Sequence, residues 1–152
     1  MRPYGLTVLR LCLAAVFLAH GAQKLLGLWG GPGLAGTAKM VGSLGLPYAY
    51  PLAVLLAVTE CAGGIMLILG WLTPWVAFAL AVDMGVAIWK VHYPNGFFLT
   101  GGHGGPGIEY VLVLLGGVVC LMLSGAGALS VDDWRSQTAE ARARGRARAR
   151  KV

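Results

Sequence analysis

Four long runs of apolar residues, separated by short polar or glycine-rich stretches, dominate the pattern along the chain. They cover about residues 6–28, 51–69, 74–91 and 108–123. A helix needs about 20 apolar residues to cross the hydrocarbon core of a bilayer, and the fourth run is the shortest of the set. Pro51 and Pro74 open the second and third runs, as the first turn of a helix tolerates proline. The pattern predicts an all-α protein built as a four-helix transmembrane bundle.

The composition indicates a lipid environment for most of the chain. Of the 152 residues, 57% are hydrophobic and 12% are charged, whereas a soluble domain has roughly 25% charged residues. Cys12, Cys61 and Cys120 lie singly inside apolar runs, so we interpret them as small apolar side chains. The sequence has no C-x-x-C motif, which argues against a dithiol redox centre of the thioredoxin type. The length predicts one membrane domain, residues 1–132, followed by a tail.

Positive charge gathers in that tail, residues 133–152. Seven of the twelve basic residues follow Asp133, namely Arg135, Arg142, Arg144, Arg146, Arg148, Arg150 and Lys151. Arginine at every second position spreads charge around a helix, so we predict a disordered tail that meets anionic lipid headgroups rather than nucleic acid. Basic flanks stay in the cytoplasm, and four spans return the chain to its starting side. We therefore predict a multi-pass protein of the inner (plasma) membrane with both termini cytoplasmic.

The two predicted outer loops, about residues 30–50 and 92–107, are rich in glycine and proline. Such stretches favour tight turns between elements. We predict tight caps or re-entrant backbone there rather than a separate soluble domain.

Ionisable residues inside the spans are the most informative positions. Each costs about 2.5–3.5 kcal/mol on insertion scales, so such residues normally face the bundle interior and find partners. Arg10, His20 and Lys24 share roughly one stripe of the first helix. Glu60 lies in the second span, where the glycines that follow it would let helices approach closely and bring it near that stripe.

The spacing predicts two polar layers. A mid-membrane layer holds Glu60 and Asp83, and an outer layer holds His20, Lys24, Lys90, His92, His103 and Glu109. These charges either neutralise one another and fix the helix register, or they line an outward-opening pocket that binds a ligand or handles protons. For the pocket, the candidate ligand-binding residues are His20, Lys24, Glu60 and Glu109, with polar support from Arg10, Asp83, Lys90 and His103. The histidine spacing matches no metal-binding pattern, and we predict no metal site.

Several short motifs resemble the DoxX family of small bacterial membrane proteins. His20-Gly21-Ala22-Gln23-Lys24 is similar to the family's H-G-x-x-K signature, and Gly70-Trp71-Leu72-Thr73-Pro74 is similar to its G-x-x-T-[RP] turn. Gly45-Leu46-Pro47, Glu60 with Gly63-Gly64, Asn95-Gly96-Phe97-Phe98, Glu109 and the stretch 125–132 also fit. The resemblance covers about residues 6–132 and implies a four-helix membrane fold. It points to His20, Lys24, Glu60 and Glu109 as the signature polar positions.

The resemblance implies two functions, and it leaves open whether the chain is an enzyme. Some members are linked to quinone-coupled sulfur oxidation or membrane redox complexes, so the first is a subunit or accessory of a quinone-linked redox system. Quinone is then the expected ligand, with Lys24 or His20 as donor and Glu60 as proton source. The alternative is a non-enzymatic scaffold or assembly factor for a partner protein. The candidate associations of the chain are with a partner protein or with further copies of itself. A small transporter is disfavoured because the sequence has no pair of broken helices.

Overall fold

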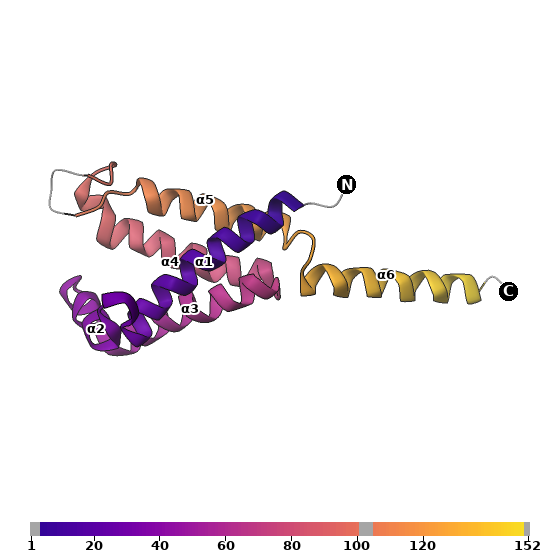
Figure 1. Ribbon diagram of the computed structural model, residues 1–152, viewed down its shortest axis with the longest axis horizontal. Helices are drawn as coiled ribbons and strands as arrows, with labels where there is room; N and C mark the ends of the chain where they lie inside the picture. The colour runs from indigo at the N-terminus through magenta and orange to yellow at the C-terminus, as the bar shows by residue number, and fades with distance from the viewer. Residues whose placement is uncertain (1–3, 101–104, 151–152) are drawn as a thin grey trace.

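The computed structural model describes residues 4–100 and 105–150, and within these ranges the protein is all-α (Figure 1). Its six α-helices are α1 (Tyr4–Leu26), α2 (Gly33–Ser43), α3 (Ala49–Leu69), α4 (Thr73–Ala87), α5 (Glu109–Ser124) and α6 (Val131–Ala149). A short 3-10 turn, Leu28–Gly30, follows α1, and α4 continues through a π-helical turn, Ile88–His92, and a 3-10 turn, Tyr93–Asn95.

Each of the four predicted apolar runs falls on a helix. Among the described residues, α1, α3 and the continuous segment Thr73–Asn95 are long and apolar enough to cross a membrane, and α5 is a shorter apolar helix of 16 residues. The prediction of an all-α fold with several membrane-spanning helices is confirmed. The largest buried apolar side chains, Phe17, Leu67, Leu80 and Leu121, come from these four helices and form one core.

The helix α2 was not predicted, because tight caps or re-entrant backbone were expected over residues 30–50. Residues 33–43 instead form a helix that packs against α3 and buries Thr37 and Val41. Glycine lowers helix propensity by about 1 kcal/mol per residue, and three of these eleven residues are glycine. Packing against α3 therefore decides the conformation of this segment, and local propensity does not.

Glycines set the close crossing of α1 and α3. A Cβ atom on Gly64 would lie 2.7 Å from the backbone nitrogen of Leu18, and one on Gly21 would collide with the backbone of Cys61. Each helix thus presents a glycine to the backbone of the other, as small residues do where membrane helices pack closely. This contact confirms the prediction that glycines near Glu60 bring it close to the first helix.

Exposed aromatic side chains gather at both ends of the bundle. We call the end where α1 begins, α3 turns into α4 and α5 leads to α6 the terminal end, and the opposite end, with α2 and the α4–α5 connection, the loop end (Figure 1). The exposed aromatics include Tyr4, Trp71, Trp75 and Trp134 at the terminal end, and Trp29, Tyr48, Tyr50, Trp89 and Tyr93 at the loop end. Two such belts are typical of the two interfaces of a membrane.

Helix α6 extends away from the bundle and has no buried residue (Figure 1). We predicted a disordered tail over residues 133–152, and the structure differs, since residues 131–149 are helical. The Ser130 hydroxyl accepts a hydrogen bond from the backbone N–H of Asp133 at 3.1 Å and caps the helix. Asp132 and Asp133 in the first turn and arginines in the last turn also oppose the helix dipole. These local signals account for a helix whose hydrogen bonds to the bundle, among the described residues, are those of Asp132 in its first turn.

Candidate functional site

The buried arginine of the first helix belongs to the terminal end. Arg10 is 1% exposed, and its Nη1 and Nη2 atoms donate to the carbonyl oxygens of Ala126 and Leu129, each at 2.9 Å. One turn earlier, the Thr7 hydroxyl donates to the carbonyl of Ala128 at 2.6 Å. Arg10 was predicted as polar support for a ligand pocket, and the structure shows that it instead ties the α5–α6 connection to α1.

Asp132 completes this set of contacts, and we name Thr7, Arg10 and Asp132, with the backbone groups that they bind, the terminal clasp. The two carboxylate oxygens of Asp132 accept hydrogen bonds from the backbone N–H groups of Leu72 (3.0 Å) and Thr73 (2.8 Å), and its own N–H donates to the carbonyl of Gly70 (3.0 Å). Asp132 therefore caps the start of α4 from 59 residues away. Sequence reasoning missed this role, because the capping residue lies outside the local window in which caps are sought.

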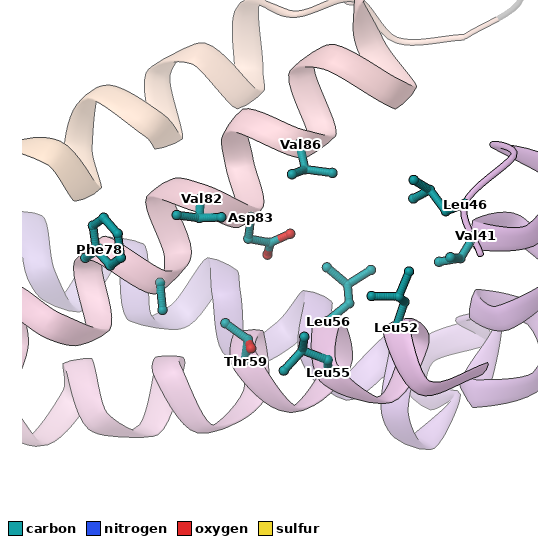
Figure 2. Close-up of a pocket in the computed structure, with 11 residues that line it drawn as sticks. Val41, Leu46, Leu52, Leu55, Leu56, Thr59, Phe78, Val82, Asp83 and Val86 are labelled. Carbon is teal, nitrogen blue, oxygen red and sulfur yellow. The ribbon is translucent and has the colours of Figure 1, made fainter. Parts of the chain in front are cut away.

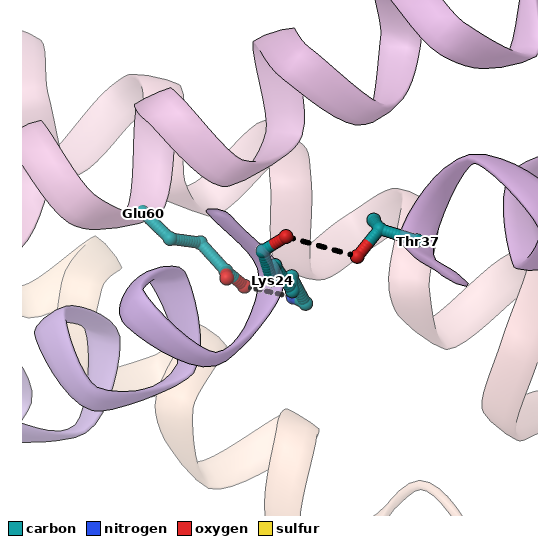
Figure 3. Close-up of polar contacts among 3 residues, drawn as sticks. All are labelled: Lys24, Thr37 and Glu60. Carbon is teal, nitrogen blue, oxygen red and sulfur yellow. Dashed lines mark hydrogen bonds and ion pairs between the residues drawn. The ribbon is translucent and has the colours of Figure 1, made fainter. Parts of the chain in front are cut away.

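The last turn of α1 and the middle of α3 bring opposite charges together (Figure 3). Nζ of Lys24 lies 2.5 Å from Oε1 of Glu60, whose side chain is 2% exposed, and the Lys24 side chain is 22% exposed. Thr37 of α2 lies beside this pair, with its hydroxyl 3.3 Å from the Lys24 carbonyl oxygen. The second carboxylate oxygen of Glu60, Oε2, is buried and has no hydrogen-bond partner among residues 4–100 and 105–150. Lys24 therefore satisfies half of the Glu60 carboxyl group.

Asp83 of α4 joins the same cluster. Its side chain projects from α4 toward α3 (Figure 2), and its carboxyl group lies next to that of Glu60 and within electrostatic range of Lys24. Asp83 Oδ2 is likewise buried without a partner in the described part of the chain. We name Lys24, Glu60 and Asp83 the charged cluster. Three helices each contribute one member.

A cavity of about 220 Å³, the polar cavity, opens on one side of the charged cluster between α1, α4 and α5. Its polar lining comes from His20, Lys24, Glu60, His92 and Tyr110. His20 is exposed, and the remaining wall is largely apolar side chains such as those of Phe17, Met84 and Leu114. The structure thus brings together three of the four predicted ligand-binding residues, and it adds Tyr110, which the sequence pattern did not single out.

A second cavity of about 410 Å³, the apolar cavity, lies on the other side of the cluster (Figure 2). Leucine, valine, alanine and phenylalanine side chains of α2, α3 and α4 and of the α2–α3 connection form most of its wall. Among the residues that the structure describes, Asp83 is the one ionisable member of this lining. Glu60 and Asp83 therefore face different cavities although their carboxyl groups are neighbours.

The remaining candidates lie apart from the cluster. Glu109 Oε1 accepts a hydrogen bond from the backbone N–H of Leu99 at 2.5 Å, and Glu109 does not line the polar cavity. Lys90 stacks its ammonium group 4.0 Å above the ring of Trp89, an interfacial cation–π contact. His103 lies outside the described residues. The outer layer predicted from the sequence is thus split, and only part of it reaches the cavity.

The all-α fold, the apolar spans and the aromatic belts define a multi-pass membrane protein with a buried charged cluster. The model of the DoxX family matches residues 5–93, which is more than half of the chain, so the chain belongs to the DoxX family. The matched region contains His20, Lys24, Glu60 and Asp83, whereas Glu109 and α6 follow it.

Related proteins agree with this assignment. An uncharacterized protein of Haemophilus influenzae is 33% identical over 139 residues, covering 87% of this chain and 91% of that protein. The inner membrane protein YphA of Escherichia coli is 27% identical over 86% of this chain and 90% of its own length. A Bacillus subtilis protein named "Putative oxidoreductase CatD" is 29% identical, with 86% of each chain covered. No solved structure gave a significant match. The chain is an inner membrane protein that contacts the lipid bilayer.

Proposed function

We propose that this protein is a subunit or accessory of a quinone-linked membrane redox system, with the polar cavity as its quinone site. One observation carries the proposal: Glu60, 2% exposed, keeps one carboxylate oxygen without a partner among the described residues, at the wall of a cavity that also presents Lys24 and His20. A buried acceptor left unsatisfied costs about 1–3 kcal/mol. The hydroxyl group of a reduced quinone (quinol) could donate a hydrogen bond there and recover that cost.

The lining of the polar cavity fits a quinone headgroup. The Lys24 ammonium and the His20 ring can donate to a ring carbonyl oxygen, and Glu60 can hold a proton beside it. The Phe17 and Tyr110 rings supply apolar surface for a flat ring. The cavity volume of about 220 Å³ lies below the roughly 300–1,000 Å³ typical of drug-sized ligands, so only a headgroup enters and the isoprenoid tail lies among the lipids. A bound quinone would supply carriage of electrons and protons.

The name of the Bacillus subtilis relative, "Putative oxidoreductase CatD", supports a redox setting for the family fold. We further propose that α1, α3, α4 and α5 all cross the membrane, with the terminal end in the cytoplasm. Two findings support this orientation. The hydrogen bonds of Arg10 place the start of α1 beside the end of α5, and the arginine-rich α6 follows at that same end.

Mass spectrometry of small molecules extracted from the protein, purified in mild detergent, tests the quinone site. The wild type should carry near-stoichiometric quinone, and Glu60→Gln and His20→Ala should lose it. Lys39→Gln is the matched control, because Lys39 is an exposed residue of α2 that lines neither cavity. Bulk phospholipid alone in all samples would refute the quinone site and leave the cluster a structural ion pair.

Helix α6 supports a second candidate function, a non-enzymatic scaffold. Its arginines lie on all sides, and no residue of α6 is buried. A helix that adsorbs flat on a membrane has an apolar face, which α6 lacks, so its charge is available to an acidic partner protein. Deleting residues 135–152 should reduce recovery of that partner from membranes. Replacing the arginines with glutamine, which keeps helix propensity, should have the same effect, and unchanged recovery in both variants would refute the scaffold.

A further inference from the structure

The charged cluster holds two acids and one base. With both acids ionised, Lys24, Glu60 and Asp83 would carry one positive and two negative charges. An uncompensated charge in a low-dielectric interior costs several kcal/mol, and two neighbouring carboxyl groups that cannot both ionise share a proton instead. One proton on the pair makes the cluster neutral.

The hydrogen bonds of the cluster also indicate one proton on the two acids. Lys24 satisfies Oε1 of Glu60, and within the cluster Oε2 of Glu60 and Oδ2 of Asp83 remain buried without a partner in the described ranges. The other two such atoms in these ranges, Arg10 Nε and Thr73 Oγ1, belong to the terminal end. The carboxyl groups of Glu60 and Asp83 are neighbours. A carboxylate can only accept, whereas a protonated carboxyl group also donates. One added proton therefore supplies the missing hydrogen bond between the two residues.

Among residues 4–100 and 105–150, no other charged group near the cluster removes the need for this proton. From α1, His20 is exposed at the polar cavity, and from α2 only the neutral Thr37 reaches Lys24. After α4, the His92 ring contacts the Pro106 carbonyl at 2.9 Å. From α5, Tyr110 lines the polar cavity, and Glu109, which does not line it, accepts a hydrogen bond from the backbone N–H of Leu99 in its wall.

We propose that Glu60 and Asp83 share one proton in the resting protein, and that Asp83 acts as a positioning residue that keeps this proton beside the polar cavity. Asp83 faces the apolar cavity and Glu60 the polar one, so the proton can move from the Asp83 carboxyl group to Glu60 without passing through water. The role as a proton store for the polar cavity rests on the proposed quinone site. The shared proton itself does not.

Infrared spectroscopy of the full-length protein in mild detergent near neutral pH tests the shared proton without any quinone. A protonated carboxyl group gives a carbonyl stretch that shifts in D₂O. The wild type should show this band, and both Glu60→Gln and Asp83→Asn should lose it, because each leaves one acid opposite Lys24. Lys24→Met should raise the band about twofold, because two acids without a cation each need a proton.

Glu109→Gln is the matched control and should keep the wild-type band, since Glu109 lies outside the cluster. All variants are compared at the wild-type elution volume, and the gain in Lys24→Met is a readout that a misfolded cluster would not produce. Absence of the band in the wild type, or its survival in Asp83→Asn, would overturn the proposal. Quinone bound without the band would overturn only the shared proton, and the band without quinone would overturn only the quinone site.

Discussion

Two cations on the same helix, the buried Arg10 and the partly buried Lys24, look alike in the sequence and differ in the structure. Arg10 lies in the terminal clasp, where two backbone carbonyls accept its hydrogen bonds, and it lines neither the polar nor the apolar cavity. Lys24 pairs with a single carboxylate oxygen beside the polar cavity. Arg10 joins segments of backbone that are distant in the sequence. Beside Lys24, Oε2 of Glu60 and Oδ2 of Asp83 have no hydrogen-bond partner among the described residues.

This difference shows how a buried charge in a membrane protein can be interpreted. A charge in hydrocarbon is costly at either position, so burial alone does not separate structure from function. The separating observation is what the partners are. Carbonyl partners away from the polar and apolar cavities indicate that Arg10 stabilises the fold. Acid partners whose oxygen atoms lack a partner among the described residues, next to these cavities, indicate that Lys24 and Glu60 serve a ligand or a proton.

Removing the arginine should have the largest effect on stability. Arg10→Met leaves the carbonyls of Ala126 and Leu129 without donors, and we expect the free energy of unfolding to fall by roughly 2–6 kcal/mol, at about 1–3 kcal/mol for each unsatisfied group. Thermal unfolding in detergent measures this loss. Arg10→Lys should recover only part of it, because an ammonium lacks the planar fork. The quinone content of the folded fraction should not change. A loss of quinone with full stability would show that Arg10 serves the ligand site and not the fold.

A change at the crossing of α1 and α3 should lower stability and disturb the charged cluster together. Gly21→Ala forces its Cβ against the backbone of Cys61, so α1 and α3 must separate, at a cost of about 1–3 kcal/mol. The Lys24–Glu60 contact should lengthen and quinone content should fall with stability. Gly116→Ala is the control, since nothing lies within 4 Å of a Cβ there. Equal behaviour of the two variants would show that the crossing is not close.

Features with a local signature could be predicted from the sequence. The four apolar runs mark helices, and the spacing of His20, Lys24 and Glu60 near glycines indicated a meeting of α1 and α3. Arg10 was misassigned because its partners are backbone carbonyls 116 and 119 residues away, which no side-chain pattern marks. The contact between Asp83 and Glu60 depends on the relative rotation of α3 and α4, which helical periodicity leaves undetermined.

Replacing the lysine should cost less stability than replacing the arginine. In Lys24→Met the pair of Glu60 and Asp83 takes up a second proton, so that neither acid stays charged. The loss in the free energy of unfolding is therefore limited to one charged hydrogen bond, about 1.5 kcal/mol. Quinone content should nevertheless drop strongly, the reverse of the Arg10→Met result. The double variant Lys24→Met/Glu60→Gln should be about as stable as Lys24→Met in a double-mutant cycle. A further loss in the double variant would show that Glu60 has another structural partner.

Removing the distant cap should have a smaller effect. Asp132→Ala deletes the acceptor for the first N–H groups of α4, and loss of such a cap costs about 1 kcal/mol. Thermal unfolding should show the loss, and the infrared band of the charged cluster should stay, because the cap lies at the terminal end. Asp133→Ala controls for the neighbouring charge, which makes no bond to α4. A changed band in Asp132→Ala would mean that the two regions are coupled through α4.

Shortening α6 should have the smallest effect on stability. A chain that ends after Ser136 keeps Asp132 and the exposed Trp134 and loses only residues that make no buried contact, so its free energy of unfolding should stay within about 0.5 kcal/mol of the wild type. A loss as large as that of Asp132→Ala would show that α6 packs on the bundle or the lipid surface. If stability and quinone content are both kept while recovery of a partner protein falls, α6 contributes to association alone, independently of both the clasp and the charged cluster.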